Sequence, residues 1–311
     1  MKKMKEIIPA IDRAVLKQEL NRERFIRYTN FGKNEIYIVD ANNAPETLRE
    51  IARLREITFR AAGGGTGKDC DIDAYDVGDN PFGQLIVWSP ADEQITGGYR
   101  FKHCKELEIG EDGRVKTPTS KLFAYSEEFV EDYIPVTIEL GRSFVQPDYQ
   151  PMRNMRKGLY SLDNLWDGLG ALVLENPDVK YLFGKITMYR HTDLLAREAI
   201  VYFLRRFFPD PEKLAYPHDP VLLKTDPGVF EKIFSGSDYD ENYRLLQQFV
   251  RSRRENIPPL VNAYMNLSST MKFFGTALNR SFGDVEESGI IIKIDDIYGA
   301  KKDRHLENIS R

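Results

Sequence analysis

The spacing of apolar residues predicts helices over several long stretches of the chain. In these stretches apolar side chains recur every three or four positions, which places them on one face of a helix. The stretches are 2–20, 42–60, 160–175, 192–208, 242–254 and 258–269. Pro45 and the two prolines at 258–259 stand near the starts of two helices, where proline is well tolerated, and Thr192 is a candidate N-cap for another.

Other stretches alternate between apolar and polar residues, or run apolar, and predict strands. EIYIVD (35–40) alternates, and FGQLIVWS (82–89) and QITGGYRFKH (94–103) flank a short polar turn, as in a β-hairpin. Further strands are predicted at 133–145, 180–188, 270–278 and 289–297. The order of elements indicates an α/β fold with a mixed sheet, and it lacks the regular βαβ alternation of a dinucleotide-binding fold.

The same patterns divide the chain into five segments. Residues 209–240 are rich in Pro, Asp and Gly and predict an insertion or long loop, and the last dozen residues are polar and expected to fray. We therefore expect an N-terminal helical extension (1–34), a core (35–208), an insertion with a helix (209–256), a return to the core sheet (257–299) and a tail (300–311).

The composition is that of an ordinary globular protein, and it excludes several classes. Of 311 residues, 41% are hydrophobic and 30% are charged, and the net charge of −4 gives no reason to expect nucleic acid as a partner. Cys70 and Cys104 are too few for a disulfide framework. No signal-peptide pattern and no membrane-spanning apolar stretch occurs. We expect a cytoplasmic protein, with contact to the inner membrane face left open.

Two loops approach known ligand-binding motifs without matching them. GGGTGK (63–68) has Ala62 and Asp69 where a phosphate-binding P-loop needs Gly and Ser or Thr, and it follows a predicted helix. The acidic run DCDIDAYD lacks the Gly and Glu of a calcium loop. It is either a solvated turn or a recognition site for a substrate ammonium. The 4 histidines lack zinc-site spacing, so no metal is expected.

The stretch IELGRSF (138–144) is the most unusual in the chain. It places Glu139 and Arg142 in an otherwise apolar strand, where burying both is costly unless they are paired. Strict alternation puts the two side chains on opposite faces of a sheet, whereas a bulge near Gly141 would change that. From the residues alone, a structural ion pair and a reaction centre are both open.

Seven motifs follow one another along the first two thirds of the chain. They are RLREITF (53–59), DIDAYD (71–76), ITGGYRF (95–101), FAYSEEF (123–129), IELGRSFVQPDY (138–149), SLDNLW (161–166) and YLFGKITM (181–188). In this order and spacing the chain resembles the ornithine–acyl-ACP N-acyltransferases of the GNAT superfamily, whose members are often called hemolysin-like. Acyl-homoserine-lactone synthases are more distantly similar.

The resemblance implies a GNAT acyltransferase fold over 35–208 and an N-acyltransferase reaction. A long acyl chain, such as a 3-hydroxyacyl chain, would pass from acyl-carrier protein (ACP) to the α-amine of an amino acid. The acceptor would be ornithine or, as in related glycine-lipid enzymes, glycine. No permanently bound cofactor is expected, because the acyl-phosphopantetheine of ACP, or acyl-CoA in its place, is a donor substrate. The long C-terminal part departs from compact family members and leaves the acceptor open.

The resemblance also implies roles for individual residues. Glu139 is the candidate general base for the amine, with an Asp of the 69–76 loop as the alternative, and the backbone around 141–144 would hold the oxyanion. The predicted catalytic residues are Glu139, Arg142 and Ser143. The predicted acceptor-binding residues are Arg55, Asp71, Asp73, Asp76 and Arg100, and the predicted donor-binding residues are Phe144, Val145, Arg153, Arg156, Lys157 and Gly158. Arg100 and Arg142 would hold either the loop carboxylates or the carboxylate of the acceptor.

The predicted donor loop departs from the usual GNAT pattern. Arg156 stands where the first Gly of Gln/Arg-x-x-Gly-x-Gly/Ala is expected, which favours acyl-ACP over acetyl-CoA. Its basic residues would hold the phosphopantetheine phosphate at a helix N-terminus, although a solvated basic turn accounts for them equally well. RRFF (205–208) and RSRR (251–254) are candidate docking patches for ACP or anionic lipid. An acetyl-CoA-dependent N-acetyltransferase and a non-catalytic GNAT-fold binding module are the alternative functions.

Overall fold

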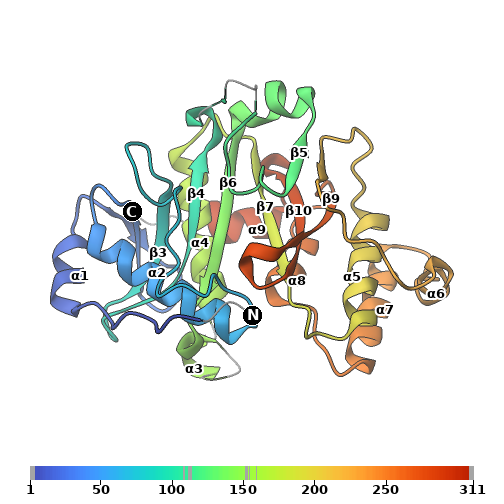
Figure 1. Ribbon diagram of the computed structural model, residues 1–311, viewed down its shortest axis with the longest axis horizontal. Coiled ribbons are helices and arrows are strands. Elements are labelled where there is room, and N and C mark those ends of the chain that lie inside the picture. The colour runs from blue at the N-terminus through green and yellow to red at the C-terminus, as the bar shows by residue number, and fades with distance from the viewer. Residues whose placement is uncertain are drawn as a thin grey trace. The chain divides into compact units, whose positions relative to one another are not determined.

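The computed structural model (Figure 1) describes residues 4–107, 109–110, 114–150, 153, 155–158 and 160–307. The chain forms two compact units. The first contains Met1–Leu107, Val136–Lys180 and Gly299–Arg311, and the second contains Glu108–Pro135 and Tyr181–Tyr298. Both units are therefore built from segments that are far apart in the sequence.

Five strands of the first unit pair antiparallel in the order β1–β2–β3–β4–β6. Their bounds are β1 Phe25–Tyr28, β2 Glu35–Val39, β3 Gly83–Ser89, β4 Gln94–His103 and β6 Thr137–Val145. The predicted hairpin is confirmed as β3 and β4, and the predicted strand at 35–40 as β2. Leu85, Ile86 and Val87 of β3 are fully buried, as expected for a strand with a helix on each face.

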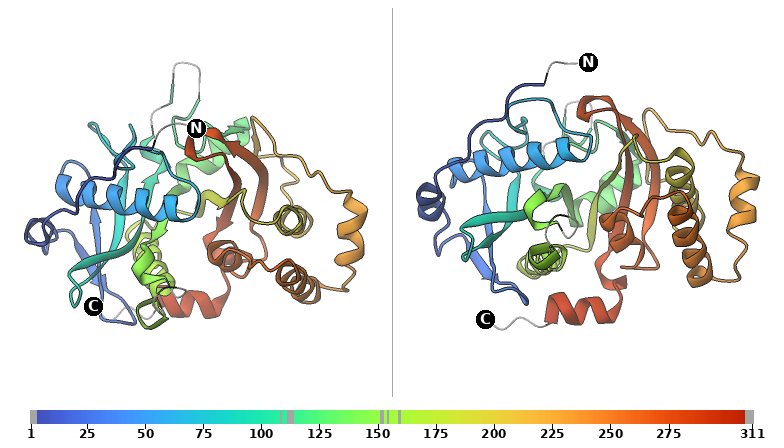
Figure 2. Two further views of the ribbon diagram at one scale, coloured as in Figure 1. Left: turned by 60° about the horizontal axis from the view of Figure 1, so that its bottom comes forward. Right: turned by 90° about the horizontal axis from the view of Figure 1, so that it is seen from below.

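Two long helices cover opposite faces of these strands (Figure 2): α2 Pro45–Ala61 and α4 Ser161–Glu175. Adjacent residues of β3 contact one helix each, because successive side chains of a strand point to opposite faces. Gln84 is hydrogen-bonded to Arg55 of α2, and Leu85 packs against Gly168 of α4. A Cβ at Gly168 would lie 2.8 Å from the Leu85 side chain, so glycine permits this close packing. Shorter helices of this unit are α1 Arg13–Glu19, α3 Met155–Gly158 and α9 Gly299–Lys302.

The second unit has its own strands and an aromatic interior. β7 Tyr181–Met188, β10 Val285–Lys293 and β9 Lys272–Asn279 pair antiparallel in the order β7–β10–β9, and β5 Phe123–Tyr125 pairs with β8 Ala215–Pro217. Its helices are α5 Leu194–Phe207, α6 Pro227–Ile233, α7 Tyr239–Ser252 and α8 Pro259–Met265. The rings of Phe129, Phe183 and Phe274 have centroids 5.3 to 5.9 Å apart, a spacing typical of edge-on aromatic packing. The predicted α/β class is confirmed.

The predicted helix at 2–20 is wrong over most of its length. Among the described residues 4–20, the helix covers Arg13–Glu19, and it begins where the Asp12 side chain accepts a hydrogen bond from the Ala14 N–H. Before it, the backbone N–H groups of Lys5 and Ile8 donate to the carbonyls of Gly67 and Asp69. These bonds to a distant loop replace helical bonds, and Pro9 has no N–H to donate.

Several further boundaries differ from the prediction. The strand expected at 289–297 runs over Val285–Lys293, because Ile294–Asp296 form a 3₁₀ turn. The strand expected at 133–145 starts only at Thr137, because Phe129–Val136 form helical turns. Asp193, not Thr192, caps α5, since its side chain accepts a hydrogen bond from the Ala196 N–H at 3.0 Å. The stretch 209–240 is not all loop, because it contains β8 and α6.

The tail expected to fray at 300–311 is ordered and helical through residue 307. Arg304 pairs with Asp163, and Nδ1 of His305 lies 2.8 Å from Oδ1 of Asp167. Asp163 and Asp167 are residues of α4. Asp167 also accepts hydrogen bonds from Asn30. Polar contacts therefore fix a segment whose sequence has no apolar periodicity.

Candidate active site

The site begins at α2, where adjacent charged residues anchor two loops. Glu56 is fully buried, and its carboxylate accepts hydrogen bonds from the backbone N–H groups of Thr66 at 3.0 Å and Gly67 at 2.7 Å, and from the Thr66 hydroxyl at 2.8 Å. The N–H groups of the GGGTGK loop therefore bind a carboxylate of the protein itself. This pairing accounts for the loop without a nucleotide.

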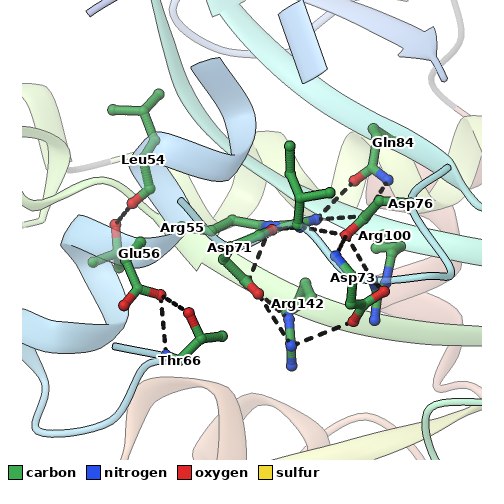
Figure 3. A network of polar contacts seen from close by, with 12 residues as sticks. Leu54, Arg55, Glu56, Thr66, Asp71, Asp73, Asp76, Gln84, Arg100 and Arg142 are labelled. Carbon is green, nitrogen blue, oxygen red and sulfur yellow. Dashed lines mark hydrogen bonds and ion pairs between the residues drawn. The ribbon is translucent and has the colours of Figure 1, made fainter. Parts of the chain in front are cut away.

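Arg55, one residue earlier on α2, binds the acidic loop (Figure 3). Its guanidinium is fully buried and forms two hydrogen bonds to the carboxylate of Asp76, at 2.9 and 3.1 Å. It also lies 3.3 Å from Oδ2 of Asp71 and donates to the Gln84 side-chain oxygen at 3.2 Å. Bidentate, charge-assisted bonds of this kind hold both partners in a single geometry.

Two arginines from the sheet complete what we call the arginine–aspartate network: Arg55, Asp71, Asp73, Asp76, Arg100 and Arg142. Arg100 of β4 lies 2.7 Å from Oδ1 of Asp73 and 3.0 Å from Oδ2 of Asp76. Arg142 of β6 lies 2.8 Å from Oδ2 of Asp71 and 3.6 Å from Oδ2 of Asp73. The network has three cations and three anions, and its members hold the 71–76 loop against α2 and the strands.

A β-bulge puts Arg142 into this network. Gly98 of β4 pairs with Phe144 and Arg100 pairs with Gly141, so two residues of β6, Arg142 and Ser143, stand opposite one residue of β4. Arg142 has φ 49°, a left-handed conformation that few non-glycine residues adopt. The bulge left open by the sequence is therefore present, and it turns the Arg142 side chain toward Asp71.

The network changes the acid–base properties of the loop carboxylates. Burial would raise the pKa of Asp73, but the charge and hydrogen bond of Arg100 together with the charge of Arg142 lower it, and the pKa lies below its ordinary value. For Asp76, burial is likewise opposed by Arg55 and Arg100, and the pKa is strongly lowered. Carboxylates with lowered pKa values are weak bases. At these two positions the carboxylates are paired with arginines, which disfavours their protonation.

Glu139 lies on the same face of the strands as the network. It is directly opposite Lys102 in the β4–β6 ladder, and Lys102 and Arg100 are two residues apart on β4, so all three side chains share a face. Glu139 is 3% exposed. Burial raises the pKa of the nearby Tyr75 to about 12, and the charges of Glu139 and Asp73 contribute to the increase. Glu139 is thus a carboxylate outside the network but close to it.

The predicted donor-binding residues are less well assembled. Phe144 is buried and Val145 is half-buried in β6, and Arg153 is exposed. Lys157 of α3 lies 2.7 Å from Oδ1 of Asp92 and 5.2 Å from the centre of the Tyr149 ring. Gly158 ends α3, and the side chain of Arg156 lies outside the described residues. Lys157 therefore forms an ion pair with Asp92, a residue of the same chain in the turn between β3 and β4.

The two basic patches lie at opposite ends of α5. Arg205 and Arg206 are in its last turn, and Arg206 donates to the carbonyl of Phe234. Arg253 lies 2.7 Å from Oδ2 of Asp193, which caps the start of α5. The two patches therefore do not form one continuous docking surface.

Sequence reasoning missed two residues that hold the site together. Gln84 joins Arg55 to Asp76, and Glu56 anchors the glycine-rich loop. A polar residue in an apolar strand was the available signal for Gln84. For Glu56 the signal was weaker, since charged residues are common on amphipathic helices.

Known proteins with related sequences fall in one enzyme family. Residues 54–159 match the family described as Acetyltransferase (GNAT) domain. The glycine N(alpha)-acyltransferase of Phocaeicola vulgatus is 50% identical over 305 residues, which cover 98% of this chain and 94% of that protein. The glycine N(alpha)-acyltransferase of Bacteroides thetaiotaomicron is 49% identical, covering 98% of this chain and 90% of that protein.

Solved structures are much more distant. FeeM, an N-acyl amino acid synthase from uncultured soil microbes, is 12% identical with a TM-score of 0.37, covering 85% of this chain and 92% of that one. A similarity this low supports no conclusion about this chain. In the described part of the chain, no helix has the length and apolar character needed to cross a membrane. Identities of 50% and 49% over 98% of this chain show its family. This chain is an acyltransferase with a GNAT domain and belongs to the glycine N(alpha)-acyltransferase family.

Proposed function

We propose that the protein transfers a long acyl chain, 3-hydroxyacyl chains included, from acyl-ACP to the α-amine of glycine. The observation that carries the proposal is the 50% identity, over nearly all of both chains, to an enzyme named for glycine. The departure of the 153–158 loop from the usual phosphate-binding pattern supports a carrier protein over free CoA as donor.

In the proposed mechanism, Glu139 takes the proton from the attacking amine. The neutral amine forms a C–N bond to the thioester carbonyl, and the tetrahedral oxyanion is held by backbone N–H groups of the bulged stretch Gly141–Phe144. The C–S bond then breaks, and the carrier thiol leaves with a proton. Glu139 is favoured over the loop aspartates because its carboxylate lies outside the network, whereas the pKa values of Asp73 and Asp76 are lowered.

Arg142 is proposed to bind the carboxylate of glycine. Its side chain is 18% exposed, whereas those of Arg55 and Arg100 are 0% and 2% exposed. Asp71 fixes one edge of its guanidinium, which leaves the orientation of the group set before the substrate arrives. An arginine whose orientation is already fixed by Asp71 and Asp73 can bind the carboxylate of a substrate at lower entropic cost.

The proposal is tested with purified protein, 3-hydroxypalmitoyl-ACP and single amino acids. We expect release of the carrier thiol with glycine, and a product with the mass of the acylated amino acid. Ornithine, alanine and a reaction without acceptor serve as controls. Thiol release with ornithine and not glycine would correct the acceptor. Transfer from acetyl-CoA alone would support the small-acyl alternative instead.

A further inference from the structure

One carboxylate in the turn between β3 and β4 collects several contacts. Oδ1 of Asp92 lies 2.7 Å from Nζ of Lys157, and Oδ2 accepts a 2.5 Å hydrogen bond from the Tyr149 hydroxyl. The backbone N–H of Asp92 donates to the Ser89 hydroxyl at 3.3 Å. All four residues belong to the first unit. Two side chains from the segment that follows β6 therefore hold this carboxylate in place.

Tyr149 orients the aspartate and the lysine at the same time. The tyrosine is 5% exposed, so its ring is packed and has little freedom to move. Its hydroxyl bonds Asp92, and Nζ of Lys157 lies 5.2 Å from the centre of its ring, within the range of a cation–π contact. An ordinary exposed ion pair must order two mobile side chains at an entropic cost, whereas here a buried ring orders both.

Asp92 is ionised at neutral pH. Hydrogen bonds from Lys157 and Tyr149 lower the pKa of its carboxyl below the ordinary value. Lys157 therefore faces a negative charge of its own chain before any substrate arrives. The side chains of Lys157 and Asp92 are 40% and 31% exposed, so an anion from the solvent can reach both. Such an anion meets a lysine whose charge is already offset.

The position of Asp92 penalises any anion that binds Lys157. An oxygen atom about 2.8 Å from Nζ would lie within about 6 Å of Oδ1 of Asp92. The Debye length is about 8 Å at physiological ionic strength, so salt does not remove the repulsion at this distance. The penalty grows with the charge of the ligand. CoA carries a pyrophosphate and a further phosphate on its ribose, whereas carrier-bound phosphopantetheine has a single phosphodiester. The penalty is therefore larger for a CoA thioester.

We propose that Asp92, by pairing with Lys157, weakens the binding of free CoA thioesters and so favours a donor carried on a protein. This inference rests on the proposed function, which assigns the donor phosphate to the 153–158 loop, and it deepens that function by naming a residue that selects the donor. The neighbouring Glu93 pairs instead with Lys17 of α1. The same turn therefore supplies an acidic residue that serves as a matched control.

The first test measures binding by calorimetry without glycine, so that no acyl group is transferred to an acceptor. Asp92→Asn keeps the shape of the side chain and removes its charge. We expect it to lower the Kd for octanoyl-CoA about fivefold or more. The Kd for octanoyl-pantetheine, which has no phosphate, should stay within about twofold. Glu93→Gln should bind both ligands as wild-type protein does, and thermal melts check that each variant is folded.

Three outcomes of this test would overturn the inference. They are an unchanged Kd for octanoyl-CoA in Asp92→Asn, an equal gain for octanoyl-pantetheine, and no measurable binding of octanoyl-CoA to either protein. Binding of octanoyl-CoA that is measurable only in Asp92→Asn would support it.

A double variant tests whether Asp92 acts through Lys157. Lys157→Met alone should weaken the binding of octanoyl-CoA, because it removes a cation from the loop. In the Lys157→Met background, the further change Asp92→Asn should alter the Kd by less than about twofold. A fivefold gain that persists without the lysine would contradict the proposed pairing.

Turnover separates this inference from the proposed function. With glycine as acceptor, Asp92→Asn should raise kcat/KM for 3-hydroxypalmitoyl-CoA about fivefold and change the value for 3-hydroxypalmitoyl-ACP less. If wild-type protein uses the CoA thioester better than the ACP thioester, the proposed donor is wrong. The calorimetric comparison of octanoyl-CoA with octanoyl-pantetheine still decides the role of Asp92 in that case.

Discussion

The arginine–aspartate network of the first unit and the Lys185–Glu287 pair of the second are both buried charges, but their opposite charges lie at different distances. In the network, Arg55 is within 3.3 Å of two carboxylates and also bonds Gln84. In the pair, the two charges are 3.8 Å apart. Burying a charge is costly in both places, so each arrangement requires compensation.

The difference indicates what each set of charges does. A network whose members compensate one another fixes the backbone between them, and here it holds the 71–76 loop to α2 and β4. A pair whose charges are 3.8 Å apart forms no direct hydrogen bond and therefore constrains its two strands less. Arg55 and Arg100 each lie within 3.3 Å of two carboxylates, and this mutual compensation is what makes the network a scaffold.

The largest effect is expected when the network loses its central cation. Arg55→Met leaves the carboxylates of Asp71 and Asp76 buried beside too few positive charges, and the free energy of unfolding should fall by about 3–5 kcal/mol. Urea unfolding followed by circular dichroism measures the loss. Arg49→Met, which removes an exposed ion pair to Glu46 on the same helix, should cost less than about 1 kcal/mol. Equal losses in the two variants would contradict the scaffold interpretation.

The next effect concerns the carboxylate that lies outside the network. Glu139→Gln should lower kcat about a hundredfold or more while KM and the unfolding free energy change little, because the amide cannot accept the amine proton. Glu106→Gln, an exposed residue paired with Lys102, is the control and should retain turnover. Full turnover in Glu139→Gln would exclude Glu139 as the base and direct attention to the 71–76 loop.

The sequence singled out the charged residues that gather here, but it did not predict their contacts. Glu139 and Arg142 were identifiable as charges in an apolar strand, and the loop aspartates as part of a family resemblance. Their pairing depends on a helix, a loop and two strands meeting in space, which no local pattern records. From the sequence, strict alternation and a bulge near Gly141 were both possible, and only the structure shows the bulge that redirects Arg142.

The same limit applies to the fold. α2, α4 and the β3–β4 hairpin were predicted because their periodic patterns are long and bounded by turn residues. Residues 4–12 and 300–307 were predicted wrongly because hydrogen bonds and ion pairs to distant segments determine their conformation. Glu287 gave no signal, since two adjacent glutamates in a strand look alike until their partners are known.

A smaller difference is expected between the two glutamates of β10. Glu286→Gln weakens a bidentate pair and leaves Arg197 without a charged partner of equal strength, so unfolding should become easier by about 2 kcal/mol. Glu287→Gln removes a carboxylate that is poorly compensated, so the change should be below about 1 kcal/mol and of either sign. Urea unfolding of both variants gives the comparison. A larger loss for Glu287→Gln would mean that the Lys185–Glu287 pair is a structural element.

The smallest effect is the pH dependence contributed by Asp73. Because Arg100 and Arg142 together oppose the effect of burial, the pKa of Asp73 in the folded protein lies below the ordinary value of about 3.9 in the unfolded chain. The contribution of Asp73 to the free energy of unfolding is therefore present above about pH 4 and is lost as the pH falls through the folded-state pKa. The advantage of wild-type protein over Asp73→Asn in thermal midpoint should be constant from pH 7 to pH 5 and should shrink toward pH 3. Thermal melts across this range measure it. Parallel profiles for the two proteins would show that Asp73 gains nothing from Arg100, and would set this edge of the network apart from the fully buried Arg55–Asp76 pair.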